Sequence, residues 1–537
     1  MVGSGVFIGS GDSLKDPTNN YILRTKGRMC NRRYTMSIAK NEKIVTLLKH
    51  GNRLLVEPTT PRIIDILSPE LSFTEQTMAR GWEAKQRRQQ GKSVMDFIDH
   101  TLFVLDHKSR IACPYGFWKR IKVALTKAGY VVRFKDLAPP QRPEIFEPRW
   151  KNIEGMELRP GQDEFLVKIL SNRCGRMDCP PGYGKSFLIG MIGCLLPQAR
   201  IDVVTTRVSV LRERIYPELC QLCGDVGIVG GGMRKEGRRI MCYTAGSMHH
   251  SLGKADILFG DECHELGADK ASRAIMRWDT SRNFGLSASH DKRIDGKDLR
   301  VEGIFGPIIH KVDYETAKDN GLVLPIHVNW SNVVMDYDPC GGSQDVAKKR
   351  RGVWCNDVRN SIIAADAKKY DEDQQVLITC ETIQHAVNLK ALLPDYTLVY
   401  REGGMSYADR AKYSRQGLIT TDERLMDIKR RIWLTKQFER GELKKVICTT
   451  VWNVGVSFNH LKVLIRADAG GSPINDIQIP GRVSRISGGK DKGIVHDYLD
   501  QFNSGFKRRA KNRSKTYKEN NWDQTFPREG LIEEYLA

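Results

Sequence analysis

The sequence predicts an α/β protein with two successive parallel sheets and a smaller α+β unit in front of them. Its 537 residues exceed what a single hydrophobic core usually serves. From about residue 156 onwards, short apolar runs alternate with amphipathic segments, which is typical of βα units. The Pro-rich stretch 138–150 separates this pattern from the mixed one before it. We therefore expect an accessory unit over 1–150, α/β domains over 151–328 and 329–505, and a basic tail over 506–537.

Within the accessory unit, "TLFVL" (101–105) has the composition of a strand. The segment 116–137 ("GFWKRIKVALTKAGYVVRFKDL") predicts a helix, a stop at a glycine and then a strand. Residues 138–150 ("APPQRPEIFEPRW") predict a linker. This unit therefore mixes short strands with short helices.

Apolar strand-like runs continue through both expected α/β domains. The first domain contains "IDVVTT", "RRIMCYTA", "ADILFGD" and "RNFGLSAS". The second contains "QQVLITC", "YTLVY", "KKVICTT", "LKVLIRAD" and "KGIVHDY". Between the two sets, "AKKRRG" (347–352) is expected to be exposed because four of its six residues are charged.

Net charge and cysteine usage restrict the partners and the compartment. The formal charge of +21 favours a polyanionic partner, although a basic surface that serves only solubility remains an alternative. The thirteen cysteines are scattered, which favours a reducing cytosol. Cys220 and Cys223 form a CxxC pair in a helix-like run, but no second ligand pair lies nearby, so packing is favoured over zinc. No secretory signal and no apolar run long enough for a membrane span is apparent.

The stretch "CPPGYGKS" (179–186) has the end of a phosphate-binding loop. Gly182 and Gly184 let the backbone approach phosphates, Lys185 reaches the β- and γ-phosphates, and Ser186 binds Mg²⁺. An apolar helix-like run follows, and a helix N-terminus favours anions. The full pattern has Gly where this chain has Cys179, and a chance Gly-rich turn is the alternative.

The stretch "ADILFGDECHEL" (255–266) places four possible metal ligands or acid–base groups side by side. Asp261 and Glu262 follow an apolar strand-like run, and ligands of open α/β sheets bind at that end of the strands. Asp261 then stabilises Mg²⁺ and Glu262 orients or deprotonates water. Cys263 is expected to pack into the core as a small hydrophobe.

Six further segments, taken with these two, resemble the conserved motifs of superfamily 2 helicases and translocases, in the family's order from residue 158 to residue 485. They are "LRPGQDEFL" (158–166), "VVTTRVSVLRE" (203–213), "YTAGSM" (243–248), "GLSAS" (285–289), "VICTTVWNVGVSF" (446–458) and "QIPGRVSR" (478–485). Ser289 stands where Thr is usual, and Cys179 replaces the usual small residue.

This resemblance implies roles for individual residues. Nucleotide contacts fall on Arg159, Gln162, Pro181, Gly182, Tyr183, Gly184, Lys185, Ser186, Phe187 and Gly455. Catalysis falls on Lys185, Asp261, Glu262, Gln478, Arg482 and Arg485, with the last two as arginine fingers, and Ser186 and Asp261 hold Mg²⁺. Coupling of hydrolysis to movement falls on His264, Ser287, Ala288 and Ser289. Nucleic-acid contacts fall on Thr206, Arg207, Thr244, Thr449 and Thr450.

The finer resemblance is to the branch that contains XPB, RecG and the phage helicase UvsW. "DECH", "GLSASHDKRIDGKD" and "GIFGPIIHKVDYETAKDNGLVLP" carry it, and residues 113–136 resemble the accessory unit that precedes that motor. The branch implies an ATP- and Mg²⁺-dependent monomer that moves 3′ to 5′ on DNA forks, junctions or RNA–DNA hybrids. By analogy with phage members, it acts in the cytoplasm of a host.

Three alternatives remain open at this point. The same motor could serve as an RNA helicase, or as a duplex translocase that never separates strands. A nucleic-acid-binding protein with a purely structural nucleotide site is disfavoured by the acid pair and the two arginines.

The insertion 403–431 contains no readable motif, and a solvated insertion is the commoner case.

Overall fold

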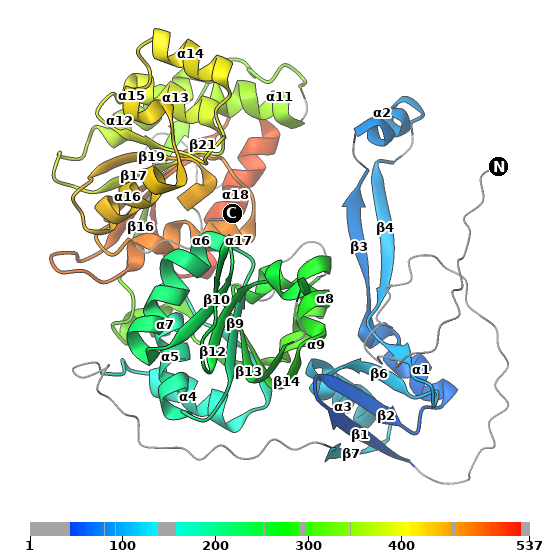
Figure 1. Cartoon of the computed structure of the whole chain (residues 1–537). Helices are drawn as coiled ribbons and strands as arrows, with labels where there is room; N and C mark the ends of the chain where they lie inside the picture. Colours follow the sequence, from blue (N-terminus) through cyan, green and yellow to red (C-terminus); the bar gives the residue numbers. More distant parts are fainter. Residues whose placement is uncertain are drawn as a thin grey trace.

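The computed structural model describes residues 43–79, 81–91, 93–137, 157–250, 253–288, 297–343, 345–452 and 458–527. These residues form three main sheets and one two-stranded ribbon (Figure 1). The Pro-rich segment 138–150, expected as a linker, lies outside the described residues, as do Ser289 and Gly455. None of the described helices is both long and apolar enough to cross a membrane.

The N-terminal unit is a five-stranded sheet in the order β5-β6-β2-β1-β7, with β1 and β7 parallel and its other neighbours antiparallel. The predicted helix, glycine stop and strand are confirmed, because Gly129 with φ +86° separates α3 from β7. The strand expected at 101–105 is largely wrong, since β4 ends at Thr101 and only a two-residue β5 follows. The elements are β1 Ile44–His50, β2 Arg53–Glu57, α1 Pro61–Leu67, β5 Val104–Leu105, β6 Ile111–Pro114, α3 Trp118–Lys127 and β7 Val131–Asp136.

A ribbon of β3 (Ser72–Met78) and β4 (Met95–Thr101) rises from this unit and carries α2 (Gly81–Gln89) at its far end (Figure 1). Its base is joined to the following lobe: Lys297 Nζ lies 2.6 Å from Glu75 Oε1, and Arg300 Nη2 lies 3.1 Å from His100 Nδ1. The ribbon is thus anchored at one end and projects at the other.

The N-terminal unit packs closely on the first lobe. Arg120 donates two hydrogen bonds of 2.8 Å to the Glu302 carboxylate. Gly116 lies so close to this lobe that an added Cβ would stand 2.1 Å from the Glu302 carbonyl oxygen, which explains the glycine there. The two parts therefore share a packed interface.

The first lobe is an eight-stranded sheet in the order β11-β10-β12-β9-β13-β14-β8-β15, parallel except for the β10–β11 pair. All four strands expected here are confirmed as β9, β12, β13 and β14. Its strands are β8 Cys174–Asp178, β9 Ile201–Thr205, β10 Val226–Gly230, β11 Met233–Lys235, β12 Ile240–Thr244, β13 Lys254–Asp261, β14 Asp279–Ser287 and β15 Ile308–Lys311. Its helices are α4 Gln162–Ser171, α5 Lys185–Leu195, α6 Val208–Val210, α7 Tyr216–Cys223, α8 Asp269–Met276, α9 Asp298–Phe305 and α10 Tyr314–Asp319, with a π-helical turn over Leu211–Ile215.

The second lobe is a seven-stranded, all-parallel sheet in the order β18-β19-β17-β20-β21-β16-β22. All five expected strands are confirmed. Its strands are β16 Ile326–Val333, β17 Val376–Thr379, β18 Thr397–Val399, β19 Lys445–Cys448, β20 Val463–Arg466, β21 Gly493–Asp500 and β22 Asp523–Thr525. Its helices are α11 Asp345–Lys349, α12 Asp357–Ala367, α13 Ile383–Leu392, α14 Tyr407–Arg415, α15 Thr421–Arg424, α16 Ile428–Glu439, α17 Pro473–Gln478 and α18 Ser504–Glu519.

Two expected boundaries are wrong. The boundary at 328/329 falls inside β16, which pairs along its whole length with β21 of the second sheet. The basic segment after 505 is no appended tail, because α18 packs on the second sheet and β22 pairs with β16. The sequence did not predict this packed helix because segment 506–518 has seven Lys and Arg residues, a composition typical of a solvated segment. One of the seven, Arg513, is nevertheless buried.

The buried Arg513 is expected to contribute to the free energy of unfolding of the second lobe. Its guanidinium donates two 2.9 Å hydrogen bonds to Asp497 and one of 2.7 Å to the Gly470 carbonyl. Arg513→Ala leaves a buried carboxylate without its cation, which costs about 3–5 kcal/mol. We expect the thermal midpoint of the second-lobe transition to fall by at least ~6 °C. Lys515→Ala, at an exposed position of the same helix, serves as the control and should leave the midpoint unchanged.

Candidate active site

The loop between β8 and α5 has the backbone of a phosphate-binding loop. Gly182 and Gly184 both have φ +89°, a conformation that side chains other than glycine rarely adopt. An added Cβ at Gly184 would stand 2.9 Å from Gln162 Nε2, so the loop is also packed from outside. Lys185 and Ser186 open α5, and both are buried. Cys179, the departure from the usual pattern, packs its thiol into the lobe's core while its carbonyl accepts a 3.0 Å bond from Lys185 Nζ.

β8, which leads into this loop, is a polar strand, since its five residues (CGRMD) include an arginine and an aspartate. It forms because Arg176 at its centre is paired: its Nε donates to the Gly306 carbonyl at 2.8 Å, and its Nη2 lies 3.7 Å from Glu302. A buried arginine neutralised by a distant acid cannot be foreseen from local composition.

Gln162, expected to contact adenine, is fixed to the loop in this structure. Its Nε2 donates to the Tyr183 carbonyl at 2.7 Å, and its Oε1 accepts from the Arg159 backbone N–H at 3.0 Å. Tyr183 is buried, and its hydroxyl donates to the Gly161 carbonyl at 2.8 Å. Arg159 is exposed, and Pro181 and Phe187 are half-buried. These contacts stabilise the shape of the loop.

The acid pair lies at the carboxyl end of β13. Asp261 Oδ2 accepts a 2.6 Å bond from Arg214, whereas Asp261 Oδ1 is buried and has no hydrogen-bond partner among the described residues. Burial raises the pKa of Asp261, and the Arg214 guanidinium opposes that shift. Glu262 adopts φ +47° and ψ +52°, left-handed values that are uncommon for glutamate. Strained backbone of this kind concentrates at functional sites. The Glu262 side chain contacts Gln478 of the second lobe.

The donor set around Asp261 and Ser186 fits a magnesium ion. Mg²⁺ prefers hard oxygen ligands and often takes one carboxylate together with substrate phosphates. Asp261 Oδ1 is such an oxygen and has no hydrogen-bond partner among the described residues, and the buried Ser186 hydroxyl at the start of α5 is another. When bound, the ion would neutralise phosphate charge during hydrolysis.

The second lobe contributes the segment 478–485 to the same place. Gln478 Nε2 donates to Glu262 Oε2 at 3.2 Å, directly across the interface of the lobes. The position of an added Cβ at Gly182 lies 3.6 Å from Arg485 Cγ, so Arg485 lies against the phosphate-binding loop. Gly481 packs in the same way on Pro181. The sequence-predicted loop, acid pair and arginine segment are thus brought together.

Arginine side chains concentrate positive charge in this interface. Burial, followed by repulsion from Arg485, lowers the pKa of Arg482 to about 9. Burial, followed by repulsion from Arg214, lowers the pKa of Arg485 to about 10. Both groups remain protonated at neutral pH. A triphosphate would relieve this mutual repulsion, because guanidinium groups bind phosphate oxygens with several parallel hydrogen bonds.

The other two residues of "DECH", Cys263 and His264, lie in different surroundings. Cys263 is fully buried and lies against Gly285, where an added Cβ would stand 2.9 Å from its sulfur. His264 Nδ1 lies 2.8 Å from Ser287 Oγ and 3.5 Å from Glu262 Oε2, so it contacts both the acid pair and the "SAS" segment. Cys220 and Cys223 are half-buried and pack against the core of the first lobe.

The residues expected to contact nucleic acid lie at the ends of strands in both lobes. Glu265, not singled out from the sequence, hydrogen bonds to Thr206 and forms an ion pair with Arg207. Thr244 Oγ1 donates to Ser247 Oγ at 3.0 Å. In the second lobe Thr449 is buried and Thr450 is exposed. Arg214 and Glu218 were likewise not predicted as site residues. The one indication in the sequence was that they lie on the polar face of the helix-like run 208–223.

Comparisons with known proteins find similarity to helicases and translocases. The family described as "Helicase conserved C-terminal domain" matches residues 358–487. The DNA 3′-5′ translocase XPB2 of Sulfurisphaera tokodaii is 25% identical over 354 residues, which cover 62% of this chain and 79% of that protein. Putative helicase 22 of a Sulfolobus islandicus filamentous virus is 23% identical over 259 residues, covering 46% of this chain and 42% of the viral protein.

Solved structures similar to the chain include those of UvsW and Dbp5. UvsW of bacteriophage T4 is 17% identical, with a TM-score of 0.36, over 90% of this chain and 98% of its own. Dbp5 of S. cerevisiae, solved with RNA and ADP BeF3, is 12% identical, with a TM-score of 0.48, over 72% of this chain and 96% of its own.

A phosphate-binding loop and an acid pair on one parallel sheet, completed by arginines from a second, define an ATP-hydrolysing enzyme with two tandem RecA-like lobes. The expected fold class is confirmed. The chain is similar to helicases and translocases of superfamily 2, as the matched family and the archaeal relative indicate.

Proposed function

We propose that the protein is a DNA motor that moves 3′ to 5′ and acts on forked or branched DNA. The observation that carries the motor reading is the contact of Gln478 with Glu262, which joins the hydrolytic acid of one lobe to the arginine segment of the other. The net charge of +21 supports a nucleic-acid partner. The archaeal relative, a DNA 3′-5′ translocase, supports DNA and the direction.

In the proposed reaction Lys185 changes its partners, whereas the other residues act from the positions that they have here. Lys185 leaves the carbonyls of Cys179 and Pro180, where its Nζ now donates, and binds the β- and γ-phosphates. Glu262 accepts a proton from the attacking water or orients it, and Gln478 holds the Glu262 carboxylate. Arg482 and Arg485 donate to the γ-phosphate as negative charge develops on it.

His264 and Ser287 are proposed to couple this reaction to strand movement. They provide a polar path from Glu262 to the end of β14, because His264 contacts both. We expect His264→Ala to keep ATP hydrolysis within about threefold of wild type and to lose most strand displacement, by ~10-fold or more. Both rates should be measured on one forked substrate. Strand displacement at full strength would refute the coupling role.

The choice of DNA and of branched substrates is tested by one panel. ATP hydrolysis and strand displacement are measured side by side on single-stranded DNA, blunt duplex, forks, four-way junctions and matched RNA. We expect forks and junctions to give the highest rates. Selectivity for RNA would overturn the proposed partner, and hydrolysis on duplex without displacement would favour a translocase that does not separate strands.

A further inference from the structure

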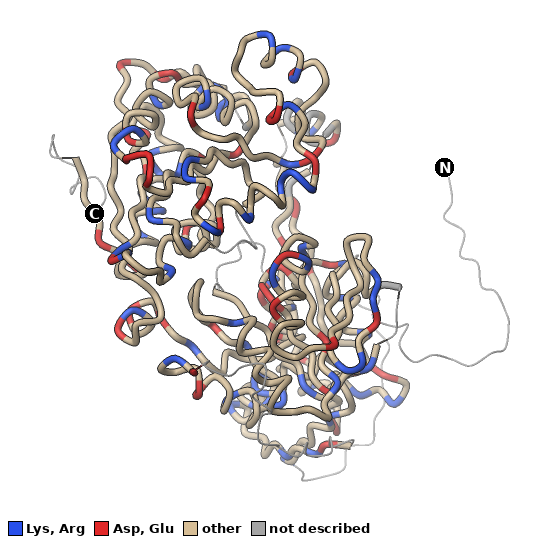
Figure 2. The backbone as a smooth tube through the Cα atoms, turned by 60° about the vertical axis from the view of Figure 1, so that its left-hand side comes forward, with Lys and Arg blue, Asp and Glu red and all other residues tan. Residues whose placement is uncertain are grey.

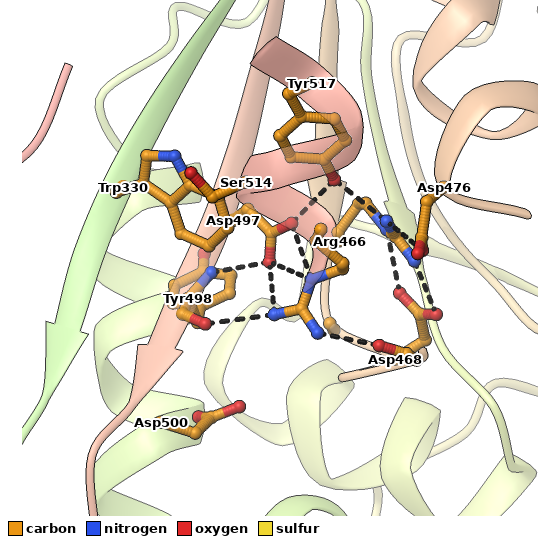
Figure 3. Close-up of polar contacts among 12 residues, drawn as sticks. Trp330, Arg466, Asp468, Asp476, Asp497, Tyr498, Asp500, Ser514 and Tyr517 are labelled. Carbon is orange, nitrogen blue, oxygen red and sulfur yellow. Dashed lines mark hydrogen bonds and ion pairs between the residues drawn. The ribbon is translucent and has the colours of Figure 1, made fainter. Parts of the chain in front are cut away.

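Helix α18 (Ser504–Glu519) has one face that is locked into the second lobe. Arg513 and Tyr517, one turn apart, both donate to the Asp497 carboxylate. Figure 3 shows the Tyr517 hydroxyl pointing at Asp497, and this bond is 2.7 Å long. The Tyr517 hydroxyl also accepts a 2.8 Å bond from Arg466, whose guanidinium pairs with Asp476 at 2.9 Å. All five side chains are buried. The rotation of α18 about its own axis is therefore fixed.

The opposite face of α18 presents a row of cations. Arg508, Lys511, Lys515 and Lys518 follow each other at intervals of three and four residues, so they lie on one side of the helix. All four are exposed, and none forms an ion pair with a residue in the described ranges. With a rise of about 1.5 Å per residue, the row is about 15 Å long. We call these four residues the basic row.

A second basic segment lies beside the start of the row. Phe506 packs between the two: Lys348 Nζ lies 5.4 Å from its ring centroid, and Arg509 Cζ lies 5.3 Å from it on the other segment. Arg350 and Arg351, which follow Lys348, are exposed. The expectation that 347–352 is exposed thus holds for its arginines, whereas Gly352 is buried against Phe506.

Elsewhere the charges are more evenly mixed. Lys and Arg are spread over both lobes with Asp and Glu among them (Figure 2). The row differs because segment 506–518 has seven Lys and Arg residues and no acid. Its rigidity matters as well, since a preorganised set of cations loses less side-chain and backbone freedom on binding.

We propose that the basic row, with Arg350 and Arg351, binds the phosphate backbone of duplex DNA outside the cleft of the motor. The proposal rests on DNA being the substrate. Duplex is favoured over a single strand because proteins that bind single strands stack bases on aromatic side chains, whereas the exposed residues of the row are all cations. Contacts of this kind are made to phosphates and carry no base sequence.

The buried face of the same helix connects this surface to the active site. Asp476, held by Arg466, lies on α17, which ends at Gln478, the residue that contacts Glu262. A continuous chain of contacts through Tyr517 and Arg466 thus connects α18, where the duplex is proposed to bind, with the segment that carries the arginine fingers.

The proposal is tested with a fourfold variant, Arg508→Gln, Lys511→Gln, Lys515→Gln and Lys518→Gln. We expect its affinity for a blunt duplex of random sequence to fall about 10- to 1000-fold at 0.15 M salt. The slope of log affinity against log salt should become flatter by up to ~3.6, since each lost phosphate contact removes about 0.9. Affinity for a short single strand should change less than threefold. An unchanged thermal midpoint shows that the fold is retained.

The matched control is Lys368→Gln, Lys412→Gln, Arg415→Gln and Lys436→Gln, which removes four exposed charges scattered over the same lobe. It should leave duplex affinity within about threefold of wild type. Equal losses in both variants, or none in the first, would overturn the proposal. If wild type binds duplex through the basic row but DNA does not stimulate its ATP hydrolysis, the proposed motor function is wrong. The proposed duplex binding by the basic row is then still supported.

Discussion

Replacing Arg482 or Arg485 by alanine is expected to lower kcat for ATP hydrolysis by roughly 10³- to 10⁵-fold, the range found for arginine fingers. Arg482 is buried in the interface and Arg485 is half-buried there, and desolvation together with repulsion between neighbouring guanidinium groups lowers the pKa of each. That arrangement favours the transition state, in which the γ-phosphoryl group spreads its negative charge over three oxygens. Steady-state hydrolysis at saturating ATP measures the loss.

Lysine substitutions separate charge from geometry at these two positions. Arg485→Lys keeps the positive charge but loses the planar set of donors, so we expect a rate between those of wild type and the alanine variant. Binding of a fluorescent ATP analogue should weaken much less than kcat falls. Wild-type kcat in both alanine variants would contradict the assignment of the interface as the site of hydrolysis.

Glu262→Gln is expected to reduce ATP hydrolysis by about 10²- to 10⁴-fold while ATP still binds, because the amide fills the same space but cannot accept the proton. Gln478 can still hydrogen bond to the new amide oxygen, so the contact between the lobes is preserved. Lys185→Ala should also abolish turnover, but by weakening the grip on the phosphates. Nucleic-acid binding should persist in both variants.

The control for Glu262→Gln is Glu164→Gln, which makes the same change at a carboxylate that is 59% exposed on α4. Its hydrolysis rate should match wild type. Unchanged hydrolysis in Glu262→Gln and Lys185→Ala together would refute the active-site assignment.

The residues whose roles depend on short-range chemistry could be predicted from the sequence. Glycines before Lys185 and Ser186 require a particular backbone, and an acid pair after an apolar strand lies at the ligand-binding edge of a sheet. The same logic placed Cys263 in the core, and it is buried there. The family resemblance, rather than local chemistry, grouped His264 with Ser287, and the two lie in contact in the structure.

What the sequence could not provide depends on partners distant along the chain. Arg176 is unfavourable in a buried strand such as β8, and its pairing with Glu302 depends on the tertiary fold. Arg513 is unfavourable in a buried helix face in the same way, and its partner Asp497 lies on another element. Arg214 and Glu265 hold Asp261 and Arg207 over separations of 47 and 58 residues. The left-handed backbone of Glu262 likewise has no local signature, since glutamate rarely adopts it.

ATP hydrolysis by wild type and by Arg485→Ala, each measured with and without forked DNA, tests whether the interface between the lobes drives the motor. We predict that forked DNA accelerates hydrolysis by wild type and leaves Arg485→Ala at its DNA-free rate. Equal acceleration of both proteins by DNA would show that hydrolysis does not depend on the arginine segment of the second lobe.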